Sequence, residues 1–213
     1  EAYAARTSTG VLVGTIGIAA YIVAYVYTAR RAPWPVSLAV AFVAFVVTGY
    51  AISGLDLSLW GAAIGGLAAL SGAFLIIPKA VDPGGVRYLP WWDIPMRMVA
   101  TATLVAIITV SADFLGPELS GVVATYPVIL SVIGTFTHSQ WGWPAVVQLA
   151  RGVSLSLMSF VAFFLVVGLS AESVGLTWAF VLAVAAALTI SAAVIVSNSR
   201  RHGARARKAK AAR

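Results

Sequence analysis

Residues 34–53 read WPVSLAVAFVAFVVTGYAIS, a run of twenty residues without a single charged side chain. An α-helix rises about 1.5 Å per residue, so this run forms a rod of about 30 Å, the thickness of the hydrocarbon core of a bilayer. A helix on the surface of a soluble protein would present a polar face to water, and this run has none. The segment therefore predicts a transmembrane helix.

Six more segments of the chain have the same character. Short breaks rich in proline, glycine or charge separate them, and the whole chain is 61% hydrophobic and 10% charged. Soluble domains carry about 25% charged residues. We therefore predict an all-α fold, a single polytopic transmembrane bundle over residues 1–196 with a basic tail over 197–213. The seven predicted spans lie near 10–29, 34–53, 57–78, 95–113, 119–137, 145–169 and 174–196.

The basic residues predict how the bundle is oriented. Seven of the fourteen Lys and Arg residues lie in Arg200–Arg213. Cytoplasmic segments of membrane proteins are enriched in Lys and Arg. With the tail inside, thirteen of the fourteen fall on the cytoplasmic side and Arg6 alone falls outside. We expect a cytoplasmic C-terminus, an outside N-terminus, and a tail that contacts anionic lipid rather than nucleic acid.

The first apolar segment lacks the basic leader of a signal peptide. The chain starts at Glu1 and not at an initiator methionine. We therefore expect either processing or further residues upstream.

The chain was also compared with itself for an internal repeat. An offset of 142 residues places the first two predicted spans on the last two, for example Gly10 on Gly152. Spans one and six would run in opposite directions, as in an inverted repeat. Only seven positions of 3–53 are identical, close to chance, so the sequence leaves the repeat open.

Ionisable groups at membrane depth are costly, so they are the first candidates for function. Arg151 lies about 10 Å into the predicted sixth span, with Gln148 one turn before it on the same face. The pair is interpreted either as a fixed charge for an anionic solute or as an arginine whose charged end reaches towards the inner interface.

A second group of polar residues surrounds the predicted fifth span. Asp113 and Glu118 form an acidic outer turn that could bind a cation or proton, or could only satisfy helix ends. Ser120 and Tyr126 are candidates for lining a cavity. Pro127 is predicted to kink the span and free a backbone carbonyl, as in the broken helices of transporters.

His138 lies at the predicted inner end of this span, where it either shuttles protons or is a solvated interfacial side chain. It is the only histidine outside the tail and the chain has no cysteine, so we predict no metal site. The last span has no lysine for a retinal Schiff base, and we expect no cofactor. The predicted topology separates His138 from Asp113 and Glu118, so we do not expect an enzyme.

Small residues mark one face of the predicted third span. Gly61 and Gly65 are four residues apart and Gly66 follows. Such faces allow two helices to approach closely. We expect a helix–helix contact here, either within the chain or with a second copy or another membrane protein.

The segments Leu119-Ser120-Gly121, Tyr126-Pro127-Val128 and Phe136-Thr137-His138 resemble patterns in uncharacterised bacterial multi-pass membrane proteins. The resemblance covers about twenty residues and implies a bacterial inner-membrane protein of transporter-like build. It transfers no site residue. We therefore expect a transporter or channel-like protein for a small solute or ion. The alternative is a non-catalytic accessory or scaffold subunit of a larger membrane complex.

Overall fold

The computed structural model describes the backbone of residues 2–55, 57–79 and 90–211. Within these ranges it describes the side chains of all residues except 2–6, 53, 111–124 and 194–211. The described chain is all-helical, and its six helices are each long and apolar enough to cross a membrane. This is the architecture of an integral membrane protein. The helices are α1 (Ala2–Thr28), α2 (Trp34–Ser53), α3 (Leu59–Ile76), α4 (Asp93–Ala124), α5 (Val128–Val174) and α6 (Leu176–Ala211).

The seven predicted spans therefore correspond to six helices, and the difference arises in the middle of the chain. The prediction ended the fourth span before Gly116-Pro117, but α4 continues through these residues to Ala124. The break lies at residues 125–127 instead, and Pro127 precedes the first turn of α5 rather than kinking a span. Both outcomes are physically reasonable, because proline is accepted next to a helix start and is also tolerated inside membrane helices. The inverted repeat is not confirmed and stays a prediction.

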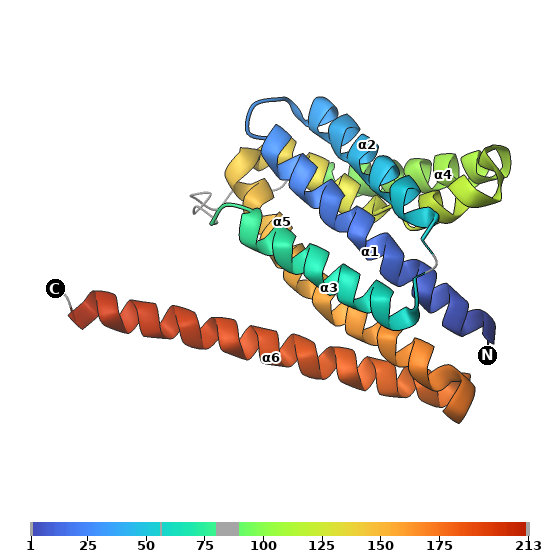
Figure 1. The fold of residues 1–213 in the computed structure, drawn as a ribbon. Helices are drawn as coiled ribbons and strands as arrows, with labels where there is room; N and C mark the ends of the chain where they lie inside the picture. Colours follow the sequence, from blue (N-terminus) through green and yellow to red (C-terminus); the bar gives the residue numbers. More distant parts are fainter. Residues whose placement is uncertain (1, 56, 80–89, 212–213) are drawn as a thin grey trace.

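Helix α5 joins two segments that were predicted to be separate spans. Its 47 residues continue through Gly142, which has a non-helical conformation (φ 74°, ψ −173°) that favours glycine. We call residues 128–141 the first arm of α5 and residues 143–174 its second arm. Figure 1 shows the chain turning at this bend, with the second arm running back alongside α3. The first arm is only about 21 Å long, shorter than the hydrocarbon core.

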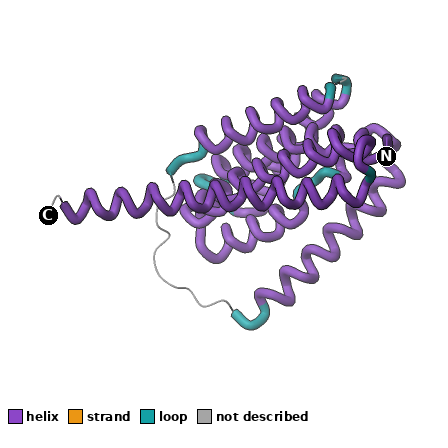
Figure 2. Tube along the Cα trace, turned by 90° about the horizontal axis from the view of Figure 1, so that it is seen from below, coloured by secondary structure: helices purple, strands orange, loops and turns teal. Residues whose placement is uncertain are grey.

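Helix α1 is the centre of the packing. It contacts α2, α3 and α5, and Figure 1 shows it between α2 and α3. Its inner face carries residues that recur every three to four positions and are at most 4% exposed: Leu12, Thr15, Ala19, Ile22 and Val26. By contrast, only 6% of the residues in the apolar stretch Asp93–Val110 of α4 are buried, and only 11% of those in the stretch Leu176–Ala193 of α6. Figure 2 shows α4 at the edge of the bundle and α6 extending past it.

The small-residue face of α3 packs within the chain. A methyl group added at Gly66 would overlap Thr15 Oγ1 of α1, and one at Gly65 would lie 3.2 Å from Ile16 Cδ1. Gly61 instead lies beside Ser58 at the start of its own helix. Gly65 and Gly66 are therefore used for the α1–α3 contact, and a partner would have to contact another part of α3.

Two glycines of α3 give a matched test of this packing. Gly66→Ala is expected to destabilise the protein by about 1–3 kcal/mol, because the added methyl overpacks the contact with Thr15. Gly72→Ala has no atom within 4 Å of its added methyl, so it is expected to be neutral or stabilising by up to about 1 kcal/mol. Thermal unfolding in detergent measures both. Equal melting temperatures for the two variants would contradict the α1–α3 contact.

Candidate functional site

The break between α4 and α5 places polar backbone groups inside the bundle. Pro127 has φ −79° and ψ 70°, so the chain leaves the helix there. The carbonyl of Pro127 accepts a hydrogen bond from the backbone N–H of Ser131 at 2.9 Å, and that of Tyr126 from Val128 at 2.8 Å. Lipid offers no water to the backbone groups that a helix break leaves unpaired. At this break the Ser131 side chain also contacts the Pro127 carbonyl, with Oγ 3.0 Å from it.

Ser131 lies at the centre of a buried group of hydroxyls. The Tyr21 hydroxyl of α1 donates to Ser131 Oγ at 2.9 Å. Ser131 Oγ lies 2.8 Å from the Tyr126 hydroxyl and 3.0 Å from the Pro127 carbonyl, so its proton has two acceptors. The rings of Phe42 and Phe45 from α2 contact the Tyr126 ring edge to face, with centroids 5.5 and 5.4 Å away. Three helices therefore enclose this group.

Two further polar side chains continue from it along α1 and α5. The Tyr25 ring stacks on that of Tyr21 with centroids 6.1 Å apart, and it meets the His138 ring edge to face at 5.9 Å. Tyr25 is 4% exposed. Its hydroxyl and His138 Nδ1 are buried and have no hydrogen-bond partner among the described groups. We call Tyr126, Ser131, Tyr21, Tyr25 and His138 the tyrosine–histidine row.

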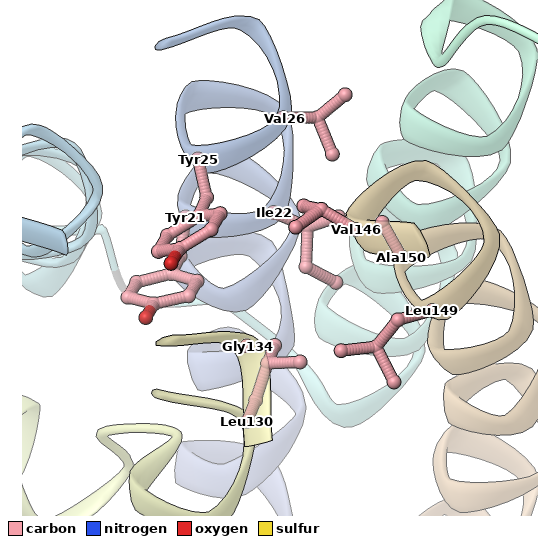
Figure 3. Close-up of a pocket in the computed structure, with 9 residues that line it drawn as sticks. All are labelled: Tyr21, Ile22, Tyr25, Val26, Leu130, Gly134, Val146, Leu149 and Ala150. Carbon is pink, nitrogen blue, oxygen red and sulfur yellow. The ribbon is translucent and has the colours of Figure 1, made fainter. Parts of the chain in front are cut away.

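A small cavity lies beside the row. Figure 3 shows Tyr21 and Tyr25 on one side of it and residues of α5 on the other. Its volume is about 20 Å³, which is room for one water molecule. Organic ligands occupy pockets of roughly 300 Å³ or more. The cavity thus has the scale of a water or a single small ion. Its lining is completed by apolar residues and one glycine: Ile22, Val26, Leu130, Gly134, Val146, Leu149 and Ala150.

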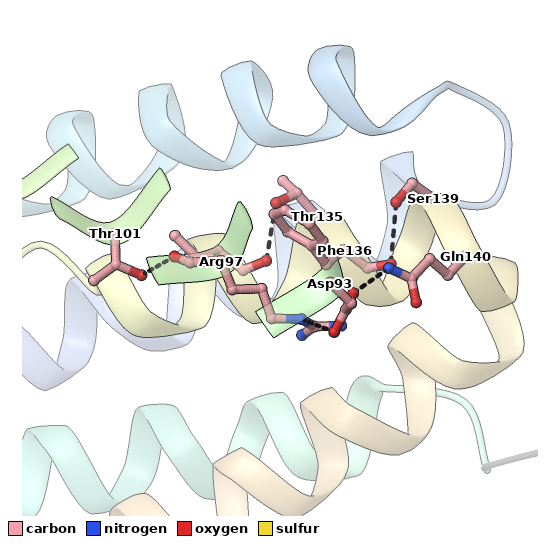
Figure 4. A network of polar contacts seen from close by, with 8 residues as sticks. Asp93, Arg97, Thr101, Thr135, Phe136, Ser139 and Gln140 are labelled. Carbon is pink, nitrogen blue, oxygen red and sulfur yellow. Dashed lines mark hydrogen bonds and ion pairs between the residues drawn. The ribbon is translucent and has the colours of Figure 1, made fainter. Parts of the chain in front are cut away.

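A second polar cluster joins α4 to the first arm of α5 (Figure 4). Asp93 is 1% exposed. Arg97 holds its carboxylate with two hydrogen bonds, from Nε at 2.7 Å and from Nη2 at 3.2 Å. Gln140 donates a third from α5. The Arg97 guanidinium also lies over the Phe136 ring, 4.9 Å from its centroid. Arg97 therefore neutralises a buried acid.

Arg151 lies apart from both clusters, at the C-terminal end of α3. Its Nη1 donates to the carbonyls of Ile77 at 2.8 Å and Phe74 at 3.1 Å. The guanidinium lies over the Phe74 ring, 4.1 Å from its centroid. These carbonyls are among those that a helix end leaves unpaired, and the negative end of the helix dipole favours a cation there. Gln148 is exposed at the surface of the second arm.

Of the residues predicted for the site, the structure thus brings together Tyr126 and His138. Arg151 and Gln148 lie elsewhere, and the side chains of Asp113, Glu118 and Ser120 lie outside the described residues. The prediction did not include Tyr21, Tyr25, Ser131, Asp93 or Gln140 among the site residues. Tyr21 and Tyr25 are four residues apart in an apolar helix, and this spacing on one face was the available signal.

Comparison with models of protein families, with curated proteins and with solved structures finds no match. Among the described residues, no group of three or more His, Cys, Asp or Glu side chains could hold a metal ion.

The Asp93–Arg97 pair can be tested by a double-mutant cycle. Arg97→Met is expected to destabilise the protein by about 3 kcal/mol, because it leaves the buried Asp93 carboxylate without its cation. Asp93→Asn in the same chain is expected to recover part of that loss, since no unpaired charge remains. Thermal unfolding of the two single variants and the double variant measures the coupling. Strictly additive effects would show that the pair does not hold α4.

Substitutions of Arg151 and Gln148 distinguish a structural role of Arg151 from a role in binding an anion. Arg151→Met is expected to lower the free energy of unfolding by about 2 kcal/mol, because charged hydrogen bonds to the end of α3 are lost. Gln148→Leu is expected to change it by less than about 0.5 kcal/mol. Melting temperatures in detergent, measured with and without panels of small anions, compare the two. A lost anion response with unchanged stability would support the predicted substrate charge instead.

Proposed function

We propose that the chain is a membrane transporter or channel-like protein that moves a small ion or solute. The supporting observation is the tyrosine–histidine row, in which three hydroxyls are hydrogen-bonded to one another and two polar atoms have no described partner. Packing alone would be served as well by apolar side chains, since a buried polar group without a partner costs free energy. Substrate and ion pathways through membrane proteins are commonly lined by polar and ionisable groups held at membrane depth.

The dimensions of the row favour the smallest species. The cavity beside Tyr21 and Tyr25 has a volume of about 20 Å³, far below that of an organic solute. A water molecule, a proton or a small ion could use such a row without a large rearrangement of α1 against α5. A larger solute would require the second arm of α5 to separate from α1, which would expose Val146 and Ala150.

The orientation proposed for the chain places its C-terminus in the cytoplasm of a bacterium and its N-terminus outside the inner membrane. In Figure 1 the start of α1 and the end of α6 lie at opposite ends of the bundle, which fits termini on opposite sides. Exposed Arg30, Arg31 and Lys79 lie on the connections that follow α1 and α3. Contact of these cations with the anionic inner leaflet would favour this orientation.

An accessory-subunit role is the second candidate, and the outer helices favour it. Only 6% of the residues in the apolar stretch Asp93–Val110 of α4 are buried. The principal helix contact of α6 is with α5. Lipid covers such surfaces in a monomer, and a partner helix would cover them in a complex. This role predicts that the isolated protein moves nothing across a bilayer.

Flux measurements on the purified protein in liposomes test the transport proposal. We expect wild-type protein to move at least one small ion from a panel of H⁺, Na⁺, K⁺ and Cl⁻ faster than protein-free liposomes do. Ser131→Ala removes the shared hydroxyl and is expected to lower that flux about tenfold, as the loss of about 1.4 kcal/mol would. Ion-sensitive dyes inside the liposomes provide the measurement.

Ser156→Ala is the matched control, since Ser156 lies on the second arm of α5, is exposed, and its hydroxyl bonds the Gly152 carbonyl of its own helix. Its flux should equal that of wild type. Wild-type liposomes that move no ion of the panel would count against transport and for the accessory role.

A further inference from the structure

We propose that the C-terminal end of α3 binds the headgroup of an anionic phospholipid, and that Arg151 and Lys79 are its principal contacts. The inference goes beyond the proposed transport function and does not rest on it. Figure 1 shows the connection after α1, the end of α3 and the bend of α5 at the same end of the bundle. In the proposed orientation this end lies in the inner leaflet.

Hydrogen bonds from two neighbouring helices fix the end of α3. The Tyr27 hydroxyl of α1 donates to the Ile76 carbonyl at 2.9 Å. From the second arm of α5, Arg151 Nη1 donates to the Ile77 carbonyl at 2.8 Å. The side chains that surround this helix end are therefore held in a defined arrangement before any ligand binds.

The Arg151 guanidinium is fixed in place, but only part of it is used. The Phe74 ring covers it, with its centroid 4.1 Å away, and Nη1 alone donates to the backbone carbonyls of the α3 end. A guanidinium has five N–H donors, so three remain on Nε and Nη2. Neither of these nitrogens donates to a described group. Adjacent N–H groups of this kind form a fork that matches two oxygens of a phosphate.

Lys79 adds a second positive charge beside Arg151. The carbonyl of Pro78, the residue before it, lies 3.4 Å from Arg151 Nη1, and the Lys79 side chain is exposed. Among the described side chains the acids are Asp93, which is paired within α4, and Glu172, which lies about 30 Å further along α5. No described acid therefore neutralises the two cations, and an anionic ligand complements them.

Arg30 brings a third cation from the connection after α1. It follows Tyr27 by three residues and is exposed, and its guanidinium lies 5.6 Å from the centroid of the Trp143 ring. A zwitterionic headgroup carries an ammonium group that these cations would repel. The surplus of positive charge therefore favours a headgroup with a net negative charge.

Exposed apolar side chains favour a lipid over a soluble anion. Leu75 and Ile76 immediately precede the α3 end and are 80% and 58% exposed, and Tyr27 beside them is 49% exposed. Acyl chains can lie against these side chains while the phosphate contacts Arg151 and Lys79. A soluble anion would bind the cations alone and leave the apolar side chains uncovered.

Native mass spectrometry of the purified protein tests the inference. The protein in detergent is titrated with phosphatidylglycerol and with phosphatidylcholine of the same acyl chains. Wild type is expected to bind the first phosphatidylglycerol at least about tenfold more tightly than phosphatidylcholine. Lys79→Gln is expected to weaken phosphatidylglycerol binding about fivefold, because it removes one cation from the headgroup.

Lys208→Gln is the matched control, because it removes the same charge from the basic tail. Its affinity for phosphatidylglycerol should match that of wild type. Equal weakening in the two lysine variants would show a general attraction to the basic end of the protein and would overturn the inference. Equal binding of the two lipids by wild type would overturn it as well.

Arg151→Lys separates headgroup binding from the structural role of Arg151. A lysine ammonium has three N–H donors, and the carbonyls at the end of α3 occupy them. The melting temperature without lipid is therefore expected to stay near that of wild type, while phosphatidylglycerol binding falls about tenfold through loss of the fork.

Melting temperatures with and without added lipid provide a second measurement. Phosphatidylglycerol is expected to raise that of wild type more than that of Arg151→Lys. An equal rise in both would contradict the proposed contact. Soluble glycerol phosphate that stabilises wild type as much as phosphatidylglycerol does would replace the lipid with a free anion and also overturn the inference. None of these results depends on ion flux, so failure here leaves the proposed transport function to its own test.

Discussion

The structure depends on one constraint: inside a bilayer every backbone N–H and C=O must find a partner in the protein. Within a helix the backbone groups pair with one another, but where a helix ends or bends some N–H and C=O groups are left without a partner in the helix. In this chain such places carry their own polar side chains. At the break, Ser131 Oγ lies 3.0 Å from the Pro127 carbonyl. At the end of α3, Arg151 and Tyr27 donate hydrogen bonds to backbone carbonyls. At the bend of α5, Trp143 donates to the Val26 carbonyl at 3.0 Å.

The same constraint explains where the candidate site lies. The first arm of α5 is short and is bounded by the break at Pro127 and the bend at Gly142. Polar residues are therefore concentrated in it, and α1 is the helix against which they pack. Ser131 and His138 meet Tyr21 and Tyr25 on the α1 side, while Gln140 meets Asp93 on the α4 side. The helix that is least regular is thus the one that holds both polar clusters.

Composition and hydropathy alone predicted the class of fold, and the α2 bounds of 34–53 were predicted without error. Proline and glycine were less informative about where the helices begin and end. Each of Gly116-Pro117, Pro127 and Gly142 could end, start or bend a helix. Packing decides among these outcomes. Of the tyrosine–histidine row, the sequence analysis named Tyr126 and His138, because polar residues at depth are conspicuous in an apolar chain. Tyr21 and Tyr25 look like ordinary core aromatics in a sequence. The partners of Arg151 are backbone carbonyls of another helix, which no side-chain pattern reveals.

We infer that the first arm of α5 turns its polar face to α1 and its apolar face to lipid. The chain has no cysteine, so a spin label on one introduced cysteine reports a single position. The most direct measurement is the collision rate of such labels with dissolved oxygen, which concentrates in the hydrocarbon core. We expect high rates at Ile129 and Ile133, which are 68% and 36% exposed, and low rates at Ser131 and Val132, which are 1% and 6% exposed. Oxygen rates at Ser131 as high as those at Ile129 would contradict it, because the polar row would then face lipid.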